Sequence, residues 1–190
     1  MAALAFWTGH RIAGSFFLLI ALFLLQFFRD PDRSPEGGEE TIVSPADGTV
    51  LSADPAPEAP EGSRRRVTIF MSVFNCHVNR APVAGRVEEY SHTPGRKMAA
   101  FHEKASLDNE QNRVTLASPR GMVTFKQIAG ALARRIVFYP RVGDGLSRGQ
   151  RVGMIKFGSR VDLFVPDGAE LLVGRGDKVK AGQTGIARWT

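Results

Sequence analysis

Few side chains in this sequence have the chemistry of metal ligands or redox groups. Four histidines lie at positions 10, 77, 92 and 102, and none has a spacing typical of metal ligands, such as His-Glu-x-x-His. A single cysteine, Cys76, excludes an internal disulfide framework and a zinc site built from several thiolates. We therefore expect no metal centre.

Three other residues could serve a nucleophilic reaction. Ser159 follows Gly158 directly, and a serine hydroxyl can act as a nucleophile when a base and an orienting group are nearby. His77 has an ordinary pKa near neutrality and Asp47 carries a carboxylate. Each also has a purely structural interpretation: Gly-Ser and Asp-Gly pairs are typical of turns, and a histidine in an apolar run is usually a buried core residue.

The elements that must position these residues are predicted to be mainly strands. Short runs rich in β-branched residues alternate with Gly, Pro and Asp turns. Residues 54–64 predict a loop, and 127–137 is the best helix candidate because alanine and isoleucine recur there. We expect a mainly β (α+β) domain with few short helices over residues 41–190. The predicted strands include residues 41–43, 67–71, 113–116, 122–125, 154–157 and 161–165.

One eight-residue pattern occurs twice. Residues 143–150 and 176–183 both follow Gly-Asp-x-apolar-x-x-Gly-Gln. Glycine supplies the positive φ that sharp turns between strands require. The pattern resembles the turns of biotinyl/lipoyl-type barrel sandwiches, so we expect a barrel-sandwich-like domain with duplicated strand-turn units. Two ordinary β-turns are the alternative.

The amino-terminal 28 residues are strongly apolar. Between residues 12 and 28 only Ser15 and Gln26 are polar, which predicts an N-terminal transmembrane helix in residues 1–28. A buried core helix would show a polar face, and a signal peptide would end in a small-residue cleavage site. Neither feature is present. Residues 29–40, with Pro31 and Pro35, predict a juxtamembrane linker.

The net charge favours an anionic partner. The chain has 25 basic and 19 acidic residues, a formal net charge of +6. An anionic membrane surface fits this balance, whereas nucleic acid is disfavoured because no recognition helix or stacking motif accompanies the charge. Basic residues on the two sides of the apolar segment nearly balance. The free thiol favours a reducing compartment, so we expect a cell-membrane protein with its domain on the cytoplasmic face.

Several segments together resemble one known family. Residues 153–162, followed by Val165-Pro166, resemble the cleavage region of phosphatidylserine decarboxylase proenzymes, closest to the short single-domain branch. Four upstream segments agree in the same order, which chance turn motifs would not do. They are Ser44–Gly48, Phe70–Pro82, the Lys-Ala-Ser of residues 104–106 with Asn109-Glu110, and residues 127–137.

The resemblance implies a self-processing, pyruvoyl-dependent enzyme. The precursor would cut itself between Gly158 and Ser159 into a β chain, 1–158, and an α chain, 159–190, that stay together as a heterodimer able to oligomerise further. Ser159 would become the covalent pyruvoyl group and form a Schiff base with phosphatidylserine, yielding phosphatidylethanolamine and CO2. Neither pyridoxal phosphate nor a metal is implied.

The resemblance also assigns roles to the other candidates. His77 would be the base and proton donor and Asp47 its orienting group. Arg80, Arg134 and Arg135 are candidates for binding the substrate's anionic groups. The long branch carries a second histidine where this chain has Arg80, and which residue replaces it stays open.

Two other functions compete with this one. The first is a non-enzymatic, membrane-tethered carrier or adaptor module of the biotinyl/lipoyl type. A carrier needs a lysine at its hairpin tip, which the Asp-Gly turns at residues 47 and 167 lack, and an adaptor needs a coiled-coil run that is also missing. The second is a pyruvoyl decarboxylase acting on a different amino headgroup.

Overall fold

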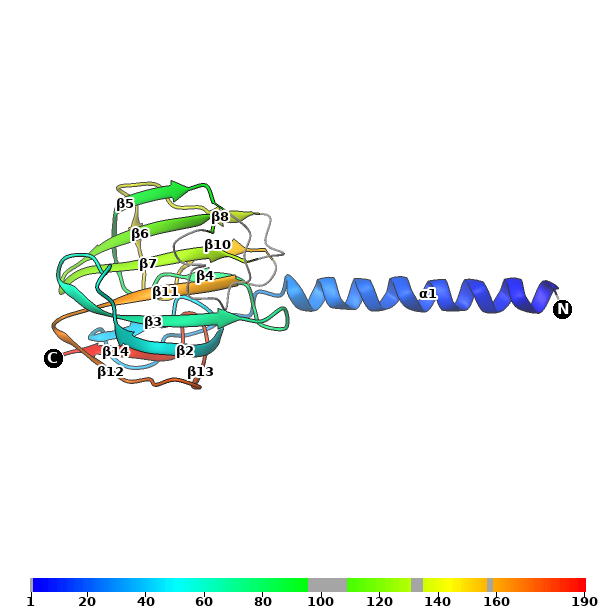
Figure 1. Cartoon of the computed structure of the whole chain (residues 1–190), viewed down its shortest axis with the longest axis horizontal. Helices are drawn as coiled ribbons and strands as arrows, with labels where there is room; N and C mark the ends of the chain where they lie inside the picture. Colours follow the sequence, from blue (N-terminus) through cyan, green and yellow to red (C-terminus); the bar gives the residue numbers. More distant parts are fainter. Residues whose placement is uncertain (1, 96–108, 131–134, 157–158) are drawn as a thin grey trace.

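The protein consists of one long helix and a β domain. A computed structural model describes residues 2–95, 109–130, 135–156 and 159–190. Helix α1 (Ala2–Phe27) projects from one end of the domain, and the C-terminus lies at the opposite end (Figure 1). The rest of the described chain forms strands, turns and loops, so the mainly β prediction is confirmed.

The strands form one large and two small antiparallel sheets. In each sheet, the strands pair in the order given, from one edge to the other. The eight-stranded sheet runs β13 (Lys178–Val179), β2 (Gly48–Pro55), β3 (Ser63–Met71), β11 (Ser159–Pro166), β7 (Gly121–Ala129), β6 (Gln111–Ser118), β5 (Gly85–Thr93) and β9 (Gly145–Leu146). One small sheet consists of β1 (Thr41–Val43), β14 (Gly185–Trp189) and β12 (Ala169–Leu171). The other consists of β4 (Val78–Arg80), β10 (Arg151–Ile155) and β8 (Ile136–Phe138).

The helix predicted over residues 127–137 is wrong where the structure describes it. Gln127–Ala129 end β7, and Ile136–Phe138 form β8. The residues at 131–134 lie outside the described part. Gln127 pairs with β6 on one side and with β11 on the other, so sheet pairing outweighs the local helical preference of this segment.

Strand β11 lies inside the large sheet and is buried along its whole length. Val161, Leu163 and Val165 face the hydrophobic core. Burying each such side chain contributes about 1.5–3 kcal/mol to folding. Arg160 and Asp162 occupy alternate positions, on the other face of the strand. The Arg160 guanidinium donates to the Asp162 carboxylate from Nε at 2.6 Å and from a terminal nitrogen at 3.0 Å. The strand therefore has two covered faces, one apolar and one holding a buried ion pair.

The two copies of the Gly-Asp-x-apolar-x-x-Gly-Gln pattern form matching turns. Both first glycines have positive φ, 96° at Gly143 and 95° at Gly176. In each copy the two glycine N–H groups donate to carbonyls of a distant segment. The hydrogen bonds are Gly143 to Val87 (2.8 Å) and Gly149 to Ala81 (2.9 Å) in one copy, and Gly176 to Val50 (2.8 Å) and Gly182 to Ser44 (2.7 Å) in the other.

The segment after α1 lies against the β domain. The Glu36 N–H donates to the Gln183 carbonyl at 3.0 Å, and Arg148 donates to the carbonyls of Gly37, Gly38 and Thr41. Residues 29–40 thus carry the chain along the domain surface.

Helix α1 differs from the expected membrane span. Within the described part of the chain, no helix combines the length and apolar character needed to cross a bilayer.

Candidate functional site

Ser159 is the first residue of β11 and has no exposed surface. It pairs with Met71 of β3 and with Ala129 of β7, and its Oγ lies 3.3 Å from the Met71 sulfur. Gly158, the other half of the predicted cleavage bond, lies outside the described residues. The nucleophile expected from the sequence is therefore held in a strand that is paired on both sides.

His77 lies directly before β4 and is also fully buried. Its Nδ1 donates a hydrogen bond to the Asn75 carbonyl at 3.0 Å, so in the neutral ring Nε2 carries the lone pair. Nε2 is buried and has no partner among the described residues. Burial lowers the pKa of the imidazole, which leaves it neutral near pH 7. An unpartnered, uncharged ring nitrogen can act as a base.

The backbone brings His77 towards the cleavage segment. Strand β10 pairs with β4, and the Ile155 N–H donates to the His77 carbonyl at 3.3 Å. Ile155 precedes Ser159 by four residues. His77 is thus hydrogen-bonded through its backbone to the end of β10, four residues before Ser159.

Asp47 is buried next to the start of β2 and is bound from two sides. Arg33 makes a bidentate ion pair with its carboxylate, with one N···O distance of 2.8 Å, and the Ala181 N–H donates to Oδ1 at 2.8 Å. The His77 ring is oriented by the hydrogen bond that its Nδ1 donates to the Asn75 carbonyl. Within the described residues, Asp47 makes no hydrogen bond to the ring. Asp47 acts on His77 through its charge, which raises the pKa of the imidazole against the larger effect of burial.

The three arginines lie in different environments. Arg80 is buried and donates to the Gly149 carbonyl at 3.0 Å, to Asp30 at 3.1 Å and to the Pro31 carbonyl at 2.8 Å. Arg135 has an exposed side chain, and its carbonyl accepts the Lys156 N–H at 3.2 Å, beside the cleavage segment. Arg134 lies outside the described residues.

A row of buried amides reaches the same site and was missed by the sequence analysis. The Asn79 amide nitrogen lies 3.9 Å from the Met71 sulfur that Ser159 also contacts. Gln127 donates to the Asn79 carbonyl oxygen at 2.8 Å, and Asn112 donates to Gln127 at 3.3 Å. Asn79 and Gln127 stand inside the segments that carry the family resemblance, but nothing local in the sequence shows that their side chains meet.

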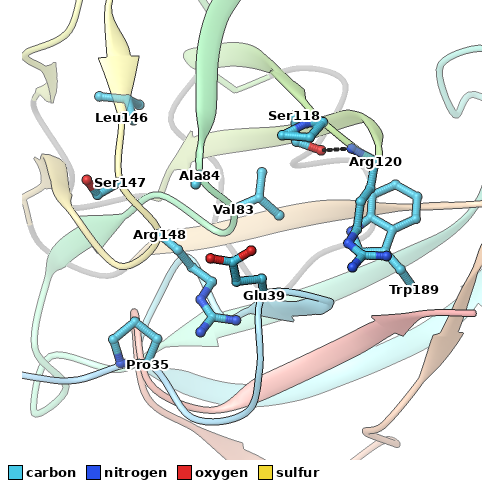
Figure 2. A pocket seen from close by; sticks show the side chains of 11 residues that line it. Pro35, Glu39, Val83, Ala84, Ser118, Arg120, Leu146, Ser147, Arg148 and Trp189 are labelled. Atoms are coloured by element: carbon cyan, nitrogen blue, oxygen red, sulfur yellow. Dashed lines mark hydrogen bonds between the residues drawn. The ribbon is translucent and has the colours of Figure 1, made fainter.

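The pocket shown in Figure 2 lies elsewhere. Arg120, Arg148, Glu39 and Trp189 are among its lining residues, and its volume is about 510 Å³. None of the three predicted catalytic residues lines it.

The described residues gather no group of three or more His, Cys, Asp and Glu side chains that could hold a metal ion. They do include a buried hydroxyl at the start of β11, that of Ser159, and the buried imidazole of His77.

Comparison with known proteins identifies the family. Residues 20–187 match the family model described as phosphatidylserine decarboxylase. Three relatives carry the name "Phosphatidylserine decarboxylase proenzyme". They come from Geotalea uraniireducens (46% identical, 92% of this chain and 83% of the relative), Trichlorobacter lovleyi (48%, 90% and 78%) and Solibacter usitatus (46%, 98% and 89%).

The family match spans most of the β domain and includes the segments that carry Ser159, His77 and Asp47. With identities well above 40% over nine-tenths of the chain, this chain belongs to the phosphatidylserine decarboxylase family.

Proposed function

We propose that this chain is a phosphatidylserine decarboxylase that cuts itself to make its own prosthetic group. Two observations in a member of this family support the proposal: the Ser159 hydroxyl is buried, and His77 is neutral with an Nε2 that has no partner among the described residues. The product would be phosphatidylethanolamine, with release of CO2.

In the processing step His77 is the base. Its Nε2 accepts the proton of the Ser159 hydroxyl, and the freed oxygen attacks the Gly158 carbonyl, which converts the amide into an ester. Loss of the Ser159 α-proton then expels the Gly158 carboxylate and leaves dehydroalanine, which hydrolyses to a pyruvoyl group and ammonia. A neutral imidazole suits the first of these steps because it needs no prior deprotonation.

The pyruvoyl carbonyl supplies the electron sink that decarboxylation of an amino acid requires. The residues of this chain bind the substrate and deliver the proton. Protonated His77 returns a proton to the substrate Cα, and the charge of Asp47 favours that protonated form. Arg135, with its exposed guanidinium beside the cleavage segment, is the best placed of the three arginines for an anionic group of the lipid; Arg134 and Arg80 are weaker candidates.

We infer further that α1 attaches the enzyme to the lipid surface where phosphatidylserine resides. Large apolar side chains of the helix are exposed, including Phe17 at 67%, Leu19 at 66% and Leu25 at 72%. The basic chain fits the anionic cytoplasmic leaflet. The paired glycine turns support the proposal that the domain contains duplicated, barrel-sandwich-like units.

The decisive experiment is the intact mass of the purified full chain and of its Ser159→Ala variant. We expect two polypeptides from the parent chain, corresponding to residues 1–158 and to 159–190 with a keto terminus in place of the serine amine. The Ser159→Ala chain should stay uncut and inactive because no hydroxyl can attack the Gly158 carbonyl. Ser147→Ala, which removes an exposed turn hydroxyl, is the matched control and should be cut normally.

A single uncut parent chain that still decarboxylates phosphatidylserine would overturn the mechanism. A cut chain that releases CO2 only from another amino lipid, in a panel of headgroups, would keep the mechanism and change the substrate.

A further inference from the structure

One side chain of α1 is unlike the others. Of residues 11–27, only Phe27 is fully buried, whereas Phe16 on the same helix is 59% exposed and the adjacent Phe28 is 44% exposed. Phe27 lies against the imidazole of His77, with ring centroids 4.3 Å apart and ring planes inclined by 31°. The last residue of the helix therefore forms a wall of the candidate active site.

The chain around Phe27 is fixed to the β domain on both sides of the histidine. Arg29 donates to the Gln26 carbonyl at 2.6 Å and to the Phe74 carbonyl at 2.9 Å, and the Cys76 thiol donates to the Arg29 carbonyl at 3.3 Å. These contacts tie the end of α1 to the segment 74–76, which leads into His77. The position of the Phe27 ring is thereby set relative to the imidazole.

The same stretch of chain contacts two more groups of the site. Asp30 pairs with Arg80, and Arg33 pairs with Asp47. The stretch Phe27–Arg33, which we call the N-terminal clasp, thus covers His77, Arg80 and Asp47 in succession. A contact to one site residue could be accidental, but three in seven residues indicate that the clasp completes the site.

We propose that Phe27 is a positioning residue for His77: its ring holds the imidazole in place and keeps water from one face of it. The proposal rests on the proposed function, in which His77 activates Ser159. The ring's Nδ1 is already fixed by the Asn75 carbonyl, so contact with Phe27 leaves Nε2 as the nitrogen free to take a proton. A misplacement of about 1 Å at such a base costs on the order of 100-fold in rate.

Two charged side chains act on the imidazole of His77. Arg29, after α1, lowers the pKa of His77, and Asp47, before β2, raises it. Burial raises the pKa of the neighbouring Cys76 thiol, so that group is neutral. Opening the Phe27 wall admits water, weakens the desolvation that dominates, and moves the pKa of His77 up towards its ordinary value.

The test compares Phe27→Ala and Phe27→Leu with Phe16→Leu as the matched control, all in the full chain in lipid vesicles. Self-cleavage of freshly synthesised precursor is followed against pH. We expect Phe27→Ala to cut at least tenfold more slowly and to lose cleavage at a higher pH on the acid side. Phe27→Leu should show a smaller shift in the same direction, and Phe16→Leu none.

An independent readout is NMR titration of His77 in the uncut Ser159→Ala chain with and without Phe27→Ala. A higher imidazole pKa in the double variant supports the proposal. An unchanged cleavage profile together with an unchanged titration overturns it. If His77→Ala is itself cut at the normal rate, the proposed role of His77 fails, while the titration still decides whether Phe27 controls the ring.

Discussion

His77 is a buried imidazole whose protonation opposes folding. Desolvation lowers the pKa of the folded-state imidazole below the ordinary value of about 6.5. Because the unfolded chain binds the proton more readily, this histidine contributes stability that is fully present above the unfolded pKa. That contribution is lost as the pH falls below about 6.5 towards the folded-state value.

We therefore expect the uncut Ser159→Ala chain to lose thermal stability between neutral pH and pH 5, and His77→Gln in that background to flatten the slope. Melting temperatures measured by circular dichroism at a series of pH values would give the slope. Thr115→Val, which breaks a buried hydroxyl pair without removing a titratable group, is the control and should keep the slope. An equally steep slope in the His77→Gln chain would show that other groups cause it.

The amide row joins three strands and ends at the Met71 sulfur that Ser159 contacts. Asn79 lies on β4, Gln127 on β7 and Asn112 on β6, and each side chain is buried. A buried amide is costly unless its partners are present, so these three residues fix the strands to one another as well as to the Met71 sulfur. The row thus connects the packing of the strands to the Met71 sulfur that Ser159 contacts.

Replacing Asn79 by Leu should separate these two effects. The Gln127 amide nitrogen loses its acceptor, so we expect a loss of about 1–3 kcal/mol in the free energy of unfolding and slower self-cleavage. Thr115→Val is the control, because it breaks a buried hydroxyl pair with Thr124 in the same sheet without touching the row. Urea unfolding measures the change in stability, and cleavage time courses measure the rate of self-cleavage. Equal cleavage rates in the two variants would remove Asn79 from the site.

The proposed cut would separate the buried strand β11 from the chain that carries its two neighbours. Strand β11 would belong to the α chain, and both of its neighbours, β3 and β7, to the β chain. The α chain would also supply β14 and β13, which pair with β1 and β2. Backbone hydrogen bonds and a shared core would therefore hold the two chains together without a covalent bond.

We expect the two chains to co-elute in gel filtration in mild detergent and to separate only in denaturant. Leu163→Ala, which leaves a cavity on β11, should lower the stability of the assembly by about 2–5 kcal/mol and let the chains separate at lower urea. Leu172→Ala removes a side chain that is 42% exposed and should change little. Separation of the parent chains in buffer alone would contradict this account.

Local patterns in the sequence predicted the strands, the glycine turns and the family, because strand propensity, turn chemistry and motif order are properties of neighbouring residues. The cut between Gly158 and Ser159 stays a prediction. Tertiary structure alone decided what lies around them. Gln127 enters a strand because two neighbours pair with it, and Asp47 binds Arg33 while the Asn75 carbonyl orients His77. Phe27 was one apolar residue among many until folding placed its ring on the imidazole, since contact between residues fifty positions apart depends on the packing of the whole chain.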